Sequence, residues 1–315
     1  MSLQRYLIKR LLVMIPVLFG VTVLTFSLTK MLPGSPVDYI LQFQEATPEL
    51  RQQLRAQYNL DEPIYVQYWL WLRDAMVLDF GDSLISDRSV AGAIRTRLPK
   101  TLLLGGAGFF IAVTIGIPLG VIAAVNKGNT VDEVSRVAAL LGIATPNFWL
   151  GLMLMLIFAV QFGLFRVIPP DQPTLSPAML KFVILPAITL GTASSALIMR
   201  LTRSSMVEEL NKDYVRTAKA KGLSERTVIV KHVLRNSMVS VVTVAAIQIA
   251  FIVNGSVVIE QVFSWPGVGR LLIDAITQRD FPVLQAIVLM IAVTIVFVNL
   301  IADLLYSWLD PRIRY

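Results

Sequence analysis

The chain has 315 residues, 55% of them hydrophobic and 16% charged, and its formal net charge is +7. A mean hydropathy of +0.67 is far above that of soluble globular proteins, so most of the chain is expected to lie in a membrane. The sequence has no cysteine, which excludes disulfides, thiolate metal sites and cysteine nucleophiles. The positive charge would attract either a nucleic acid or an anionic membrane surface as a partner. Where the basic residues lie along the chain decides between these two partners.

Six uncharged stretches are long enough to cross ~30 Å of hydrocarbon as helices, which takes roughly 20 residues. They are residues 11–29, 101–125, 137–165, 182–199, 236–259 and 281–302. Their hydrophobicity is continuous rather than alternating, which excludes a membrane β-barrel. The sequence therefore predicts an all-α, polytopic membrane helix bundle with six transmembrane helices.

The first stretch has a basic flank like that of a signal peptide. No small-x-small cleavage site follows it, because Lys30, Met31, Leu32 and Pro33 come next, so a retained anchor is expected. The segment 31–100 is then the longest connection between predicted spans. Within it, PELRQQLRAQYNL and IYVQYWLWLRDAMVL are predicted to be helical, and the aromatic residues of the second suit the headgroup level of a membrane.

Basic residues in the short loops predict the orientation of the spans. Nine Lys or Arg lie between Arg200 and Arg235, and others precede the first span, whereas the opposite short loops hold only Arg166, Lys181, Arg270 and Arg279. Both termini and the loop around residue 214 are therefore expected on the cytoplasmic side. The long segment 31–100 is placed outside the cell membrane, since long translocated regions are largely exempt from the rule.

The loop YVRTAKAKGLSERTVIVKHVLRN at 214–236 holds six Lys or Arg against one acidic residue. Helix formers run from Tyr214 to Lys221, Gly222 is typical of a helix C-terminus, and Ser224 is a predicted N-cap of a second helix beginning at Glu225. The apolar or small positions of the first helix and its end are Val215, Ala218 and Leu223. Another surface can approach this helix closely because Ala218 and Ala220 are small. A loop that only fixes the orientation of the spans in the membrane does not need two capped helices. We therefore favour the interpretation that the first helix docks into a groove of a partner protein.

The spacing of Arg216, Thr217 and Ala218, then three residues, then Gly222, resembles the EAA loop of ABC importer permeases. Arg216 stands where the consensus has Glu, Thr217 where it has Ala, and Arg235 where a Pro often follows. Such departures are common in the oligopeptide, dipeptide and nickel branch. Other blocks along the whole chain resemble that branch: LPGSP (32–36), LDEP (60–63), DFGDS (79–83), LPKTL (98–102), TPNFWLG (145–151), NGSVVIEQVFSWPGVG (254–269), DFPVLQ (280–285) and ADLLYSWLDPRIRY (302–315).

The resemblance implies a type I ABC importer permease of the inner membrane. Its expected partners are a second homologous permease, two ATP-binding subunits, an extracytoplasmic substrate-binding protein, a peptide substrate and membrane lipid, with no nucleic acid. The expected organisation is a tail and first span at 1–30, an extracytoplasmic segment at 31–100, a five-helix core at 101–306 with a coupling loop at 204–236, and a cytoplasmic tail at 307–315. The residues expected to contact the ATP-binding subunits are Tyr214, Val215, Arg216, Thr217, Ala218, Lys219, Ala220, Lys221, Gly222 and Leu223.

The sequence lacks the common motifs of nucleotide-hydrolysing, metalloprotease and serine hydrolase sites. It contains no G-x-x-x-x-G-K-[ST], H-E-x-x-H or G-x-S-x-G motif, and a single histidine, His232, cannot build a histidine metal site. We expect no catalytic residue, cofactor or metal on this chain, with ATP and Mg on the partner subunits. The small residues of GGAG (105–108) and GIPLG (116–120) are interpreted as helix-packing positions.

Polar residues inside spans are costly and are therefore pathway candidates, although hydrogen bonding between helices is the alternative. Gln248, Asn254 and Asn299 are the candidates, whereas Asp303 is interpreted as structural. In the outer loop between the last two spans, Trp265, Pro266 and Gly267 are candidates for facing the binding protein.

The predicted function is therefore a permease subunit of a binding-protein-dependent, ATP-driven importer for di- or oligopeptides, working by alternating access. Nickel chelates and glutathione remain alternative substrates. A self-sufficient secondary transporter or channel is the alternative class, and it would call for ion-coupling carboxylates within the spans.

Overall fold

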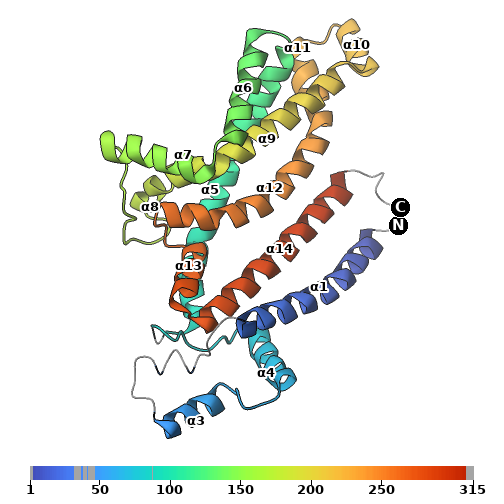
Figure 1. The fold of residues 1–315 in the computed structure, drawn as a ribbon. Helices are drawn as coiled ribbons and strands as arrows, with labels where there is room; N and C mark the ends of the chain where they lie inside the picture. Colours follow the sequence, from blue (N-terminus) through green and yellow to red (C-terminus); the bar gives the residue numbers. More distant parts are fainter. Residues whose placement is uncertain (1–2, 32–36, 38–40, 42–46, 87, 310–315) are drawn as a thin grey trace. The chain divides into compact units, whose positions relative to one another are not determined.

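The computed structural model describes residues 3–31, 37, 41, 47–86 and 88–309, which form a helical protein (Figure 1). The LPGSP block at 32–36 and the tail residues 310–315 lie outside these ranges. Within them no strand is formed, and Asp82 and Ser89 make an isolated bridge. The helices are α1 (Leu3–Met31), α3 (Pro48–Gln57), α4 (Ile64–Met76), α5 (Val90–Val125), α6 (Thr130–Ala144), α7 (Asn147–Leu154), α8 (Pro177–Phe182), α9 (Ile184–Leu210), α10 (Asp213–Ala220), α11 (Glu225–Thr227), α12 (Arg235–Val262), α13 (Val268–Gln278) and α14 (Phe281–Leu309), with π-helical segments η1 (Met155–Gln161) and η2 (Val228–Leu234).

The chain divides into two compact units. One is built around Lys100–Trp265, and the other combines Gln4–Pro99 with Pro266–Phe297. Among the described residues, five helical segments are long and apolar enough to cross a membrane: Arg10–Leu28, Val90–Val125, Ile184–Leu210, Glu225–Ile249 and Phe281–Ile301. The bent pair α6 and α7–η1 is a sixth if its two arms are counted as one span. The all-α membrane helix bundle predicted from the sequence is confirmed, with five or six candidate spans among the described residues.

The predicted third span is not a straight helix. Thr130–Ala144 and Asn147–Gln161 meet at an angle of 101°. Pro146 causes the break, because a proline disfavours helical backbone in the residue before it, and Thr145 accordingly has an extended ψ of 123°. Hydropathy alone predicts a continuous span here, since neither arm contains a charge after Arg136.

Within the first unit, α5 packs closely against α9. A Cβ added to Gly120 would lie 2.5 Å from the Cβ of Thr202 and 2.7 Å from the carbonyl oxygen of Met199. A Cβ added to Gly116 would lie 2.7 Å from the carbonyl oxygen of Ser195. The interpretation of GIPLG as a packing motif is confirmed, because only residues without a side chain allow the two backbones to approach this closely.

A buried ion pair joins the start of α6 to α9. The Asp132 side chain is 2% exposed and accepts hydrogen bonds from Arg203 Nε at 2.5 Å and Nη2 at 2.7 Å. The Gly128 N–H donates to the same carboxylate at 3.0 Å. Two hydrogen bonds from one guanidinium group and a third from the backbone offset the desolvation cost of burying the Asp132 carboxylate.

The main core of this unit contains the outer-loop tryptophan. Trp265 is fully buried, its ring stacks on Phe182 with centroids 5.8 Å apart, and its Nε1 donates to the carbonyl oxygen of Lys100 at 3.1 Å. Nearby, the buried Glu260 carboxylate accepts a hydrogen bond from Thr101 Oγ1 at 2.7 Å. The loop that follows α12 is thus fixed to the beginning of the Lys100–Trp265 segment.

In the second unit, both helices predicted between residues 48 and 78 are present as α3 and α4. Tyr68 of α4 packs on α1, with its hydroxyl 2.7 Å from Thr22 Oγ1 and its ring centroid 5.5 Å from that of Phe26. Tyr65 and Trp69 are 72% and 60% exposed, as expected of aromatic residues available to a headgroup region. A separate apolar cluster joins the first turns of α5 to α13 and α14 through buried Val90, Val268, Ala275, Val283, Ala286 and Ile287.

Candidate functional site

The predicted double helix in the basic loop is present as α10, α11 and η2, and local capping explains where each helix begins and ends. Gly222 has a φ of +77°, its N–H donates to Lys219 O at 2.9 Å, and the Leu223 N–H approaches Ala218 O at 3.4 Å. This is a Schellman C-terminus, which requires left-handed backbone that glycine adopts without strain. The Ser224 side chain then accepts a hydrogen bond from the Thr227 N–H, so the predicted N-cap is also confirmed.

One face of α10 is buried against its own chain. Val215 is 2% and Ala218 8% exposed. They pack in a cluster whose other buried members are Ala124 of α5, Met206 of α9, and Val228 and Val233 of η2. The small Ala218 therefore permits close approach of this protein's own helices, and Leu223, which follows the helix end, is 41% exposed.

The opposite face of α10 carries the charge. Arg216, Thr217, Lys219, Ala220 and Lys221 are all exposed. The Arg216 side chain is 78% exposed, and its contact with Asp213 at 3.5 Å is a surface ion pair that contributes little to stability. The positive charge of the loop is therefore presented to the surroundings.

A polar contact holds α10 to the end of α9. The half-buried Tyr214 hydroxyl donates to Glu209 Oε2 at 2.6 Å, and Lys212 pairs with the other oxygen of the same carboxylate. Burial, together with the hydrogen bond to Glu209, raises the pKa of the Tyr214 hydroxyl above its usual value. The connection between α9 and α10 is thus stiffened by a charge-assisted hydrogen bond as well as by apolar packing.

Sequence reasoning did not identify the partners of this helix. Glu209 and Met206 lie on α9 and Val228 on η2, within the predicted coupling loop at 204–236 but outside residues 214–223, which were expected to contact the ATP-binding subunits. The signal available was weak: an acidic residue five positions before Tyr214 is compatible with many arrangements. His232, the single histidine of the sequence, is half-buried in η2.

The pathway candidates lie in different environments. Gln248 of α12 is 6% exposed and donates from Nε2 to Ser194 Oγ of α9 at 3.0 Å, which is a hydrogen bond between two helices. Asn299 on α14 is exposed, whereas the side chains of Asn254 and Asp303 lie outside the described ones. The structure does not bring the three predicted pathway residues together within one described cluster, and their pathway role stays a prediction.

The residues predicted to face the binding protein differ in exposure. Trp265 and Gly267 are buried and Pro266 is half-buried, so the Trp265 indole is available to no outside partner in this conformation. Among the described residues, no group of three or more His, Cys, Asp or Glu is arranged to hold a metal ion. The expectation that this chain carries no cofactor stays a prediction.

Comparison with known proteins defines the class. Residues 116–315 match the binding-protein-dependent transport system inner membrane component, and residues 3–105 match the N-terminal part of such membrane components. The chain belongs to this family, and it is a permease subunit of a binding-protein-dependent ABC importer in the inner membrane.

Individual relatives refine this assignment. The chain is 43% identical over 310 residues to the glutathione transport system permease protein GsiC of Escherichia coli (strain K12), covering 98% of this chain and 99% of that one. The protein of the same name from Shigella flexneri serotype 5b matches equally well, at 43% over 310 residues with coverage of 98% and 99%. Among solved structures, the MetNI methionine ABC transporter in an inward-facing conformation has a TM-score of 0.55 at 14% identity, covering 69% of this chain and 96% of that chain, which shows a shared fold.

Proposed function

We propose that this chain forms half of the translocation pathway of an ATP-driven importer for short peptides, di- and oligopeptides with glutathione among them. It works by alternating access with a second permease. ATP and Mg bind to two separate ATP-binding subunits, and an extracytoplasmic binding protein delivers the substrate. No nucleic acid is involved.

The observation that carries the proposal is the two-faced helix α10. Its inner face, Val215 and Ala218, is packed against α5, α9 and η2, so a displacement of α10 is transmitted to three helical elements. Its outer face, with Arg216, Lys219 and Lys221, is exposed for a partner. An element attached on one side to a motor subunit and on the other to the bundle is what rigid-body rocking of a gate requires.

The distribution of basic residues supports a cytoplasmic position for α10 and for both chain termini. The ATP-binding subunits would then meet α10 from the cytoplasm, and the loops around α3, α4 and α13 would face the binding protein. A cysteine introduced at exposed Ala220 should react with an impermeant maleimide only in inside-out vesicles. One introduced at exposed Leu175 should react in right-side-out vesicles.

The substrate class is supported by sequence similarity at two levels, short blocks and the whole chain. The sequence blocks resemble peptide-type permeases, and the GsiC relatives are glutathione transport permeases, glutathione being a modified tripeptide. We expect the reconstituted complex of both permeases, the ATP-binding subunits and the binding protein to hydrolyse ATP faster when a di- or tripeptide is added. Stimulation by a nickel chelate and by no peptide would contradict the proposal.

A further inference from the structure

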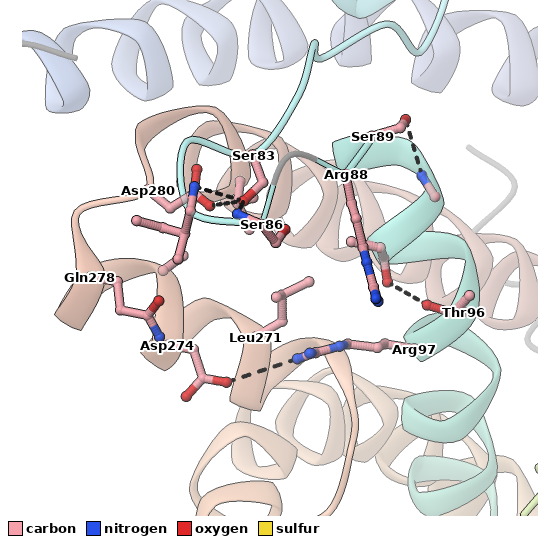
Figure 2. A pocket seen from close by; sticks show the side chains of 15 residues that line it. Ser83, Ser86, Arg88, Ser89, Thr96, Arg97, Leu271, Asp274, Gln278 and Asp280 are labelled. Atoms are coloured by element: carbon pink, nitrogen blue, oxygen red, sulfur yellow. Dashed lines mark hydrogen bonds and ion pairs between the residues drawn. The ribbon is translucent and has the colours of Figure 1, made fainter. Parts of the chain in front are cut away.

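A cavity of about 440 Å³ with charged residues in its lining lies in the second unit, between the start of α5, the loop that precedes it, and α13 (Figure 2). Its volume is at the lower end of the range for sites that hold drug-sized molecules, which suits a ligand of two or three amino acids. Its lining contains no residue of α10 and none of the candidate pathway residues, and no motif in the sequence predicts it.

Hydrogen bonds between two distant sequence blocks hold one end of the cavity. Ser83 of the DFGDS block donates from Oγ to Asp280 Oδ2 at 2.5 Å, and the Leu84 N–H donates to Asp280 Oδ1 at 3.3 Å. The Ser83 N–H in turn donates to the carbonyl oxygen of Arg88 at 2.9 Å. Both Asp280 oxygens are therefore engaged, and the loop that carries Arg88 is held in place before any ligand arrives.

Opposite charges line opposite walls of the cavity. Arg88 and Arg97 extend from the α5 side, while Asp274 and Gln278 extend from α13 (Figure 2). Arg97 Nη1 and Asp274 Oδ2 are 3.9 Å apart, which is attractive but too long for a hydrogen bond. Their side chains are 34% and 39% exposed, and no described carboxylate forms an ion pair with the exposed Arg88.

We propose that this cavity binds the two termini of a short peptide, with the carboxylate held by Arg88 and Arg97 and the ammonium group by Asp274 and Gln278. The proposal rests on the proposed function for the substrate class and for the extracytoplasmic side. It adds a substrate subsite on the permease, at the first turns of α5 and beside α13.

The charge pattern selects a zwitterion over a simple anion. A guanidinium pair alone would accept carboxylate or phosphate by bidentate hydrogen bonds. Here Asp274 and Asp280 lie on the facing side and would repel a doubly charged phosphate, whereas they favour a ligand that carries an ammonium group at its other end. An α-amino acid or peptide has that pattern at neutral pH.

Equilibrium binding of radiolabelled Ala-Ala to the full-length chain in lipid nanodiscs tests the proposal. Blocking either end of the peptide, as N-acetyl-Ala-Ala or Ala-Ala-amide, should weaken binding about tenfold or more, because each removes a charge-assisted contact. Arg88→Gln should weaken Ala-Ala binding by a similar factor. The matched control is Arg95→Gln, since Arg95 is exposed on the same helix and does not line the cavity.

Several outcomes would overturn the proposal. If the unmodified protein binds the blocked and unblocked peptides with equal affinity, the proposal is wrong, and this measurement needs no variant. An Arg88→Gln variant that binds Ala-Ala normally but loses affinity for the binding protein or for anionic lipid would also overturn it. These variants leave α10 unchanged, so the importer function can be measured separately as peptide-stimulated ATP hydrolysis. If that stimulation persists but Ala-Ala binding does not depend on the peptide termini or on Arg88, the subsite is refuted and the importer function is not.

Discussion

Replacing Ala218 by glutamate is expected to separate α10 from the helices beneath it. Ala218 is 8% exposed and lies among buried apolar side chains, including Met206 and Val228. A carboxylate at this position must either be buried without a partner or force α10 away from the cluster. Burying an unpaired charge costs several kcal/mol, so the chain will adopt whichever alternative costs less.

The cost of detaching α10 follows from its contacts. Exposing the fully buried Val215 loses about 1.5–3 kcal/mol of hydrophobic stabilisation. Breaking the hydrogen bond between Tyr214 and the Glu209 carboxylate loses about 1.5–3 kcal/mol more. Detachment therefore costs about 3–6 kcal/mol in the unmodified protein. An unpaired buried carboxylate raises the free energy of the docked state by several kcal/mol, and about 3 kcal/mol is enough to lower the ratio of docked to detached α10 by over a hundredfold.

Two measurements follow, with Ala220→Glu as the matched control because Ala220 is exposed on the same helix. Trypsin should cleave Ala218→Glu at Arg216, Lys219 or Lys221 much faster than it cleaves the unmodified protein or the control. The ATP-binding subunits should no longer co-purify with Ala218→Glu, although the transmembrane helices remain folded by circular dichroism. An Ala218→Glu protein that resists trypsin and still couples ATP hydrolysis to uptake would refute the role assigned to the inner face.

Substitutions at Gly120, Asp132 and Gly222, each with a matched second variant, test the packing around α10 and the bundle. Gly120→Val should lower the melting temperature, since overpacking typically costs about 1–3 kcal/mol, whereas Gly106→Ala, with nothing within 4 Å of its added Cβ, should leave it unchanged. Asp132→Ala should destabilise the protein by about 3 kcal/mol, the lower end for a broken buried pair, because the Arg203 side chain retains 20% exposure. A double variant with Arg203→Met should recover much of this loss in denaturation, and its failure to do so would contradict the ion-pair account. Gly222→Val should cost about 1–2 kcal/mol through left-handed backbone, while Gly222→Asn should cost less and retain the ATP-binding subunits in pull-down.

Local rules predicted the helix ends of the candidate site because these ends depend on neighbouring residues. Gly222 and Ser224 act on backbone groups three or four positions away, so helix end and helix start were readable from the sequence. The apolar segments that form the five candidate spans were equally readable, since lipid demands continuous hydrophobic length. The bend at Thr145–Pro146 was missed because proline is tolerated inside many membrane helices, and sequence does not say which ones break.

Long-range contacts were beyond sequence reasoning. Ser83 and Asp280 are 197 residues apart, and Asp132 and Arg203 are 71 apart. Each side chain alone is an ordinary polar residue near the end of a helix, and only the fold gives it its partner. The same applies to the cavity, whose two charged walls come from segments with no shared local pattern.

The central claim is that this chain conveys work from separate ATP-hydrolysing subunits through α10. Uptake of labelled peptide into proteoliposomes tests it most directly, with the complete complex, binding protein and ATP compared with the two permeases alone. The account predicts ATP-dependent uptake by the complete complex, loss of uptake with Ala218→Glu, and none by the permeases alone. Concentrative uptake at the full rate by the permeases without ATP-binding subunits would contradict it.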